Sequence, residues 1–247
     1  MRGAPKASLS SKPEAWTELA LTLPVFLVYQ LGVVFLRVRN GADIVTARLL
    51  ELSHGDRLTY LELTAGIGLV TIAVFAILGR GQALRPGKVV QIALEGTAYA
   101  VAMGATTSWV MGRLFAGPHP REGDGPLSGL VMSLGAGFYE ELAFRVVLFG
   151  FGAKLLLWAL LRQRVGLVTK APPLSTGALL TMAVWAVTSA SAFSAMHYVG
   201  ALGDPFDLRS FVARAVLGLA LTMVYAMRGF AAAVWTHTLY DIWVLVL

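Results

Sequence analysis

Long apolar runs, separated by short charged segments, occupy most of this 247-residue chain and limit what it can fold into. The runs cover residues 16–36, 59–78, 89–110, 127–150, 175–197, 211–227 and 230–247, with an extension of the fourth to 161 left open. A helix of about 20 apolar residues crosses a bilayer, and no run shows the strict alternation of a membrane β-strand. The pattern predicts an all-α, polytopic transmembrane helical bundle of about seven to eight spans.

Charge content supports lipid as the solvent of this bundle. Only 14% of the residues are charged, whereas soluble chains contain roughly a quarter. The net charge of +6 comes from Lys and Arg between the apolar runs, where such residues set membrane topology. No basic stripe with interleaved aromatic residues occurs, so we expect no nucleic-acid partner. The absence of Cys excludes disulfides, thiolate metal ligands and Cys nucleophiles.

The chain divides into three regions by composition. Residues 1–15 form a polar N-terminal tail, and residues 16–126 hold the N-terminal transmembrane helices. Within that second region, the segment near 37–58 mixes charges with spaced apolar residues and predicts a short helix lying on the membrane interface. Residues 127–247 form the third region, and this region contains ionisable groups inside its apolar runs. A composition rich in Ala, Gly, Leu, Val and Arg favours a bacterial plasma (inner) membrane.

Ionisable side chains at membrane depth are costly, so each implies a partner or a function. Three clusters fall inside predicted spans: Glu140, Glu141 and Arg145; Phe193 and His197; His237 and Asp241. On an α-helix, Glu141 and Arg145 share a face and can pair, while Glu140 points about 100° away. His237 and Asp241 also share a face. Small residues surround all three clusters and allow close helix packing, so we expect a shared polar cavity.

Structural explanations compete with functional ones for these residues. The Glu141–Arg145 pair can be a purely structural salt bridge, and a lone interior His is more often satisfied by packing than used in chemistry. Glu140 is different, because a second, unpaired carboxylate beside the first gains nothing structurally.

The ordered motifs Glu140-Glu141-xxx-Arg145, Phe193-xxx-His197 and His237-xxx-Asp241 resemble the CPBP family of intramembrane proteases. This family is also called the Abi or CAAX-protease family and includes the type II CAAX prenyl endopeptidases. Its pattern is EExxxR, FxxxH and HxxxN or HxxxD, each on its own hydrophobic segment. The resemblance spans roughly residues 127–245 and implies that the third region is the catalytic helical core of a glutamic-type intramembrane endopeptidase.

Carried over position by position, the resemblance implies roles for each motif residue. Glu140 and His197 activate the attacking water, and His237 and Asp241 occupy the positions that stabilise the oxyanion. Glu141, Arg145 and Phe193 are supporting residues. One departure matters, because the CAAX endopeptidases have Asn where this chain has Asp241. An ionised Asp cannot donate a hydrogen bond to the oxyanion. Either Asp241 is protonated, or it orients His237 and favours the positively charged form of that ring, which then donates. We favour the second interpretation.

No cofactor is expected for this mechanism, and the partners are the bilayer and a membrane-associated peptide or protein substrate. The resemblance implies prenylated C-termini, peptide or bacteriocin precursors, or C-terminal sorting tails as substrate classes. Three alternatives stay open. Two His and several carboxylates could hold a divalent metal such as zinc; the fold could serve as a non-catalytic scaffold or immunity protein; or the buried groups could relay protons in a transporter.

Overall fold

The computed structural model describes residues 14–36, 38–115, 125–162, 175–200 and 203–247, and the regular elements within these ranges are all helices. Most of the predicted polar tail, residues 1–13, lies outside the described residues. In chain order the helices are α1 (Ala15–Leu36), α2 (Ile44–Leu52), α3 (Arg57–Leu78), α4 (Pro86–Leu114), α5 (Pro126–Gly135), η1 (Ala136–Phe151), α6 (Gly152–Leu161), α7 (Thr176–Met196), α8 (Leu208–Arg228) and α9 (Phe230–Leu245). Each predicted apolar run therefore forms a helix, as expected.

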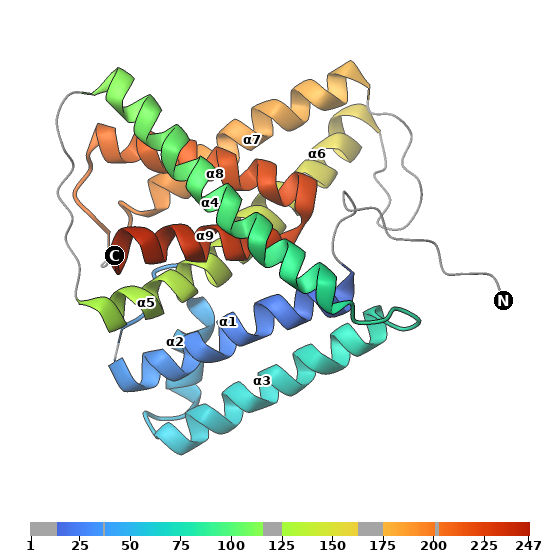
Figure 1. The fold of residues 1–247 in the computed structure, drawn as a ribbon, viewed down its shortest axis with the longest axis vertical. Coiled ribbons are helices and arrows are strands. Elements are labelled where there is room, and N and C mark those ends of the chain that lie inside the picture. The colour runs from blue at the N-terminus through green and yellow to red at the C-terminus, as the bar shows by residue number, and fades with distance from the viewer. Residues whose placement is uncertain (1–13, 37, 116–124, 163–174, 201–202) are drawn as a thin grey trace.

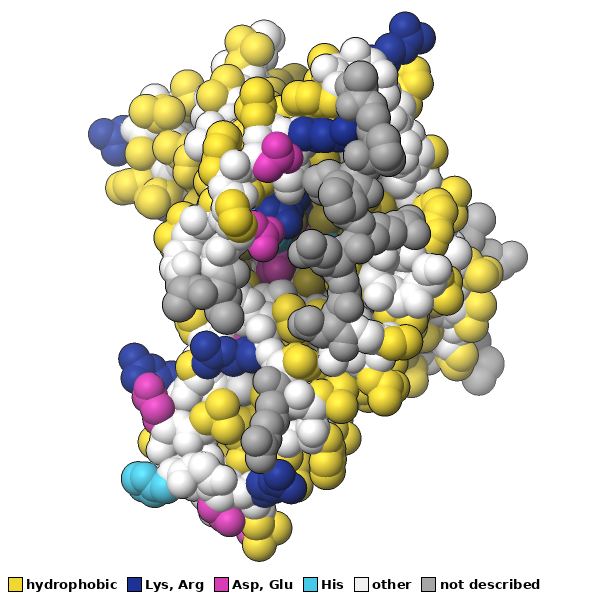
Figure 2. Space-filling model, turned by 90° about the vertical axis from the view of Figure 1, so that its left-hand side faces the viewer, with side chains coloured by type: hydrophobic (Ala, Val, Ile, Leu, Met, Phe, Trp, Pro, Cys, Tyr) yellow, Lys and Arg dark blue, Asp and Glu magenta, His cyan; other side chains and the backbone are white. Residues whose placement is uncertain are grey.

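Five of the described helical segments are long and apolar enough to cross a membrane. These are Ala15–Leu36, Arg57–Leu78, Pro126–Leu161, Thr176–Met196 and Leu208–Arg228. Large exposed hydrophobic side chains, such as Leu69 and Val70 of α3, are explained by contact with lipid rather than water. Figure 2 shows that hydrophobic side chains cover much of one face of the molecule, with acidic and basic side chains gathered around a hollow in it. The fold is an all-helical membrane bundle.

Polar side chains mark where several helices begin. The Asp43 carboxylate accepts a hydrogen bond from the Thr46 N–H at the start of α2, and Asp56 does the same for Thr59 at the start of α3. Ser175 and Asp207 cap α7 and α8 in the same way. Such caps satisfy backbone N–H groups that have no partner within the helix. The predicted short helix within 37–58 is α2, and its capping residue Asp43 is itself buried.

The helix α9 lies at the centre of the bundle, where it contacts α1, α4, α5, α8 and η1. Figure 1 shows α4 crossing over α8 and α9, while α3 lies at the edge beside α1 and α2. In the first turn of α9, Phe230 is followed by three small residues, and Ala231, Ala232 and Ala233 are fully buried. Small side chains allow neighbouring helices to approach closely in lipid. The motif residues of α9 are consequently held in the interior.

The long helical segment 126–161 contains an unexpected element. Its central part, η1, is a π-helix of 16 residues, in which backbone hydrogen bonds join residues i and i+5. The wider turn means that the α-helical spacing assumed for Glu140, Glu141 and Arg145 does not apply here. A close approach to α9 fixes the position of this element, because a Cβ atom on Gly137 would lie 1.9 Å from the Thr238 Oγ1. This contact places the two Glu residues beside His237.

Helices from both halves of the sequence share one apolar core. Val25, Phe26, Tyr29 and Val33 of α1 pack against Val131 and Leu134 of α5, Tyr139 of η1 and Val234 of α9. Buried polar groups cross the same interface, since Gln30 donates a hydrogen bond to the Tyr139 hydroxyl. The first helix therefore packs directly on the segment that carries the Glu pair.

Candidate active site

The Glu141–Arg145 pair expected from the sequence is present and fully buried. The Arg145 Nη1 lies 3.1 Å from the Glu141 Oε1, and the two side chains are 1% and 0% exposed. The Arg145 Nη2 also donates a hydrogen bond of 3.3 Å to the Gly218 carbonyl of α8. The two residues are four apart within η1, so the expected pair forms inside this one helix. It links η1 to α8.

Phe193 packs against both Arg145 of this ion pair and the two imidazoles. Its ring lies 4.3 Å from the Arg145 guanidinium carbon, a cation–π contact. The same ring meets His197 edge-on at a centroid distance of 5.1 Å and His237 at 6.0 Å. The Phe193 backbone carbonyl also lies 3.0 Å from the His197 Nδ1. A carbonyl only accepts, so the His197 Nδ1 carries the hydrogen and its Nε2 faces inward.

Glu141 has a second contact that the sequence analysis did not anticipate. Its Oε1 lies 2.8 Å from the His237 Nδ1, and since a carboxylate only accepts, the Nδ1 donates this bond. Asp241, which we expected to orient and charge His237, lies 3.5 Å from the Nε2 of that ring. The shorter contact to the ring is made by Glu141, and the role of Asp241 stays a prediction. The Glu141 contact depends on the tertiary structure, because η1 packs against α9. The packing places the Glu141 carboxylate next to the His237 Nδ1, on the side of the ring opposite the Nε2.

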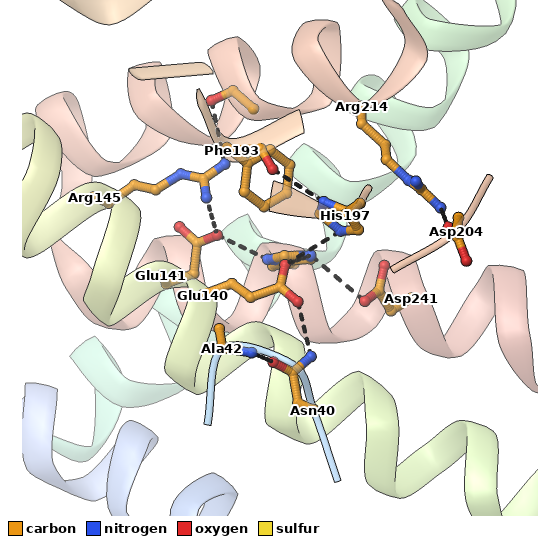
Figure 3. A network of polar contacts seen from close by, with 12 residues as sticks. Asn40, Ala42, Glu140, Glu141, Arg145, Phe193, His197, Asp204, Arg214 and Asp241 are labelled. Atoms are coloured by element: carbon orange, nitrogen blue, oxygen red, sulfur yellow. Dashed lines mark hydrogen bonds and ion pairs between the residues drawn. The ribbon is translucent and has the colours of Figure 1, made fainter. Parts of the chain in front are cut away.

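The Glu140 carboxylate faces His197 in Figure 3 and lies at a similar distance from the His237 ring. Its Oε2 is 3.9 Å from the His197 Nε2 and 4.0 Å from the His237 Nε2. Among the described residues, none donates a hydrogen bond to this buried oxygen. The Oε1 of the same carboxylate accepts a hydrogen bond of 2.8 Å from the Asn40 Nδ2. One oxygen is therefore held by the protein, while the other faces the two imidazole nitrogens.

Two side chains at this site were missed by the sequence analysis. Asn40 lies in the segment between α1 and α2, which composition assigned to the membrane interface, and no motif distinguishes it. Arg214 of α8 pairs with Asp204 at 2.6 Å and lies 5.3 Å from the Tyr198 ring. Figure 3 places this pair next to His197. Asn40 has no sequence signal that separates it from ordinary loop polarity, whereas Arg214 lies near the start of the predicted apolar run 211–227 and was not singled out there.

The contact between the His197 Nδ1 and the Phe193 carbonyl leaves the Nε2 of a neutral ring without a hydrogen. A neutral imidazole can accept a proton at its free nitrogen. That nitrogen is the Nε2, which faces Glu140.

Comparison with known proteins covers the segment that carries all three motifs. Residues 123–243 match the family model described as type II CAAX prenyl endopeptidase, Rce1-like. No match to this chain was found among curated proteins or among solved structures. The matched segment includes every motif residue from Glu140 to Asp241, while Asn40 lies outside it. Through residues 123–243 the chain belongs to the Rce1-like family of type II CAAX prenyl endopeptidases, a family of membrane proteases consistent with the CPBP family that its motifs resemble.

Proposed function

We propose that this protein is an intramembrane endopeptidase that hydrolyses a peptide bond of a membrane-associated substrate with a water activated by Glu140 and His197. The observation that supports this most directly is the convergence of the Glu140 Oε2 with the Nε2 atoms of His197 and His237. Distances of 3.9 and 4.0 Å are too long for direct hydrogen bonds. They suit a water molecule that bonds to the carboxylate and to one ring at ordinary distances of about 2.8 Å.

The reaction then proceeds through a tetrahedral intermediate. Glu140 takes one proton from the water, and the water oxygen forms a bond to the scissile carbonyl carbon. The carbonyl oxygen becomes an oxyanion, which the His237 Nε2 stabilises as a hydrogen-bond donor. The carbon–nitrogen bond breaks, and the proton held by Glu140 passes to the leaving amine. The products are a carboxylic acid and an amine, and one water is consumed.

Glu141 and Arg145 support this chemistry without touching the substrate. The carboxylate of Glu141 accepts from the His237 Nδ1, which holds the ring with its Nε2 toward Glu140. It also stabilises the positive charge that His237 carries when it donates to the oxyanion. Arg145 compensates the buried charge of Glu141, since an unpaired buried carboxylate is costly. The substrate peptide is proposed to be a precursor or a C-terminal tail embedded in or tethered to the membrane.

The experiment that tests this proposal compares the termini of membrane proteins in cells with the wild-type protein and with Glu140→Ala. We expect at least one terminus that occurs only when Glu140 is intact. The matched control is Glu62→Ala, which removes an exposed carboxylate of α3 and should leave the termini as in the wild type. If all termini are the same in the wild type and Glu140→Ala, the protein is not a protease of this kind and the scaffold alternative is favoured.

We propose further that the protein needs no metal ion. Among the described residues, no group of three or more His, Cys, Asp or Glu side chains is placed to hold one, and the proposed base, acid and oxyanion donor are all side chains. We expect activity in purified membranes to survive treatment with a zinc chelator and metal analysis to find no stoichiometric zinc. Loss of activity on chelation, restored by added zinc, would instead favour the metal-dependent alternative.

A further inference from the structure

The segment 38–43 between α1 and α2 reaches the proposed active site from outside the part of the chain that matches the family. Its Asn40 is 4% exposed and donates a hydrogen bond of 2.8 Å from Nδ2 to the Glu140 Oε1. The two residues are 100 positions apart in the sequence. In the proposed function Glu140 is the general base, so Asn40 is hydrogen-bonded to the group on which the reaction depends.

The orientation of the Asn40 carboxamide is fixed by its own loop. The Asn40 Oδ1 accepts a hydrogen bond of 2.8 Å from the Ala42 N–H, and a backbone N–H can only donate. The Nδ2 must therefore face Glu140, where a carboxylate can only accept. The carboxamide thus has one orientation that satisfies both neighbours.

The backbone of the segment is held just as firmly. The Asn40 N–H donates to the Tyr29 hydroxyl at 3.0 Å, and that hydroxyl donates to the Asp43 Oδ2 at 2.7 Å. The other oxygen of Asp43 caps α2 through the Thr46 N–H. Tyr29 is fully buried in the shared apolar core. A continuous chain of hydrogen bonds therefore connects the start of α2 and the core of α1 to Asn40. Figure 3 shows its last contact, from Asn40 to Glu140.

We propose that Asn40 is a positioning residue, which holds the Glu140 Oε1 so that the Oε2 faces the two imidazole nitrogens. This inference rests on the proposed function and extends it to the N-terminal half of the chain. A carboxylate with both oxygens free could rotate about its terminal bond and turn away from the water. Catalytic groups must be held close to their productive geometry for full rate. Asn40 supplies this restraint from a segment that the family match does not cover.

The test uses the full-length protein and a peptide that spans the Glu140-dependent cleavage site found in the comparison of termini. In Asn40→Asp the side chain keeps its shape and an acceptor for the Ala42 N–H but loses the donor to Glu140. The new carboxyl group either repels Glu140 or shares a proton with it, and both outcomes lower the fraction of Glu140 that is ionised and correctly placed. We expect kcat to fall roughly 10- to 100-fold, as for a lost hydrogen bond to a charged group, with KM within about twofold of the wild type.

Two further variants separate positioning from stability. Asn40→Ala should lower kcat to a similar extent. The matched control is Tyr60→Phe, which removes a buried hydrogen bond to Gln30 in the same part of the fold without touching Glu140. Both Asn40→Ala and Tyr60→Phe should lower Tm slightly, but only the Asn40 variants should lower kcat.

Three results would overturn the proposal. If Glu140→Ala is inactive while both Asn40 variants keep the wild-type kcat, the positioning role is wrong and the proposed function stands. If Tyr60→Phe loses as much kcat as Asn40→Ala, the role of Asn40 is structural only. If no Glu140-dependent terminus exists, the proposed function fails and the positioning role fails with it.

Discussion

Replacing Glu140 with Gln should lower kcat by about 10²–10⁴-fold, the usual contribution of a general acid–base group. Gln has nearly the same shape as Glu, and its carbonyl oxygen can still accept the hydrogen bond from Asn40. The side chain has no negative charge, however, so it cannot take a proton from the water that we place between it and His197. The loss should appear in kcat, measured with a peptide that contains the cleavage site.

Folding must be checked before this loss is assigned to chemistry. The Glu140 Oε2 makes no direct hydrogen bond with the described residues, so Glu140→Gln should leave Tm close to the wild type. Removing Glu141 is a poor alternative test, because it would leave Arg145 as an uncompensated buried charge. A folded Glu140→Gln protein that retains more than about a tenth of the wild-type kcat would contradict general-base catalysis by this residue.

The second large effect is expected at His237. In His237→Ala the oxyanion loses its donor, and the removal of one such donor lowers kcat by about 10²–10³-fold. Asp241→Asn should keep kcat within about tenfold of the wild type, because the short hydrogen bond that orients His237 comes from Glu141 and not from Asp241. An Asn at this position also carries donors that can reach the oxyanion. Parallel kinetics of the two variants measure this difference.

A comparable loss in both variants would contradict this division of roles. It would mean that the negative charge of Asp241 is needed, either to keep His237 positively charged or to hold its Nε2 from the side that faces Glu140. Equal Tm values in the wild type and in both variants would show that the difference between them lies in the reaction and not in the stability of the bundle.

The sequence by itself determined the helices and the three motifs that meet at the candidate site. Apolar length fixes each membrane helix locally, because a backbone in lipid must satisfy its own hydrogen bonds and only a helix does so within one segment. The motifs around Glu140, His197 and His237 stand out for the same reason, since ionisable groups are rare at this depth. These local signals were sufficient for the family resemblance, which the match over residues 123–243 confirms.

Only the tertiary structure decided which of these groups touch one another. Helical spacing placed Asp241 beside His237, and the two lie 3.5 Å apart, but the shorter contact to this ring comes from Glu141, 96 residues away in the sequence. The π-helical turn of η1 and its close approach to α9 at Gly137 place Glu141 next to His237. Asn40 reaches Glu140 because α1 packs on η1 through a shared core. Spacing along one helix reveals which side chains share a face, but contacts between helices depend on packing that no single segment encodes.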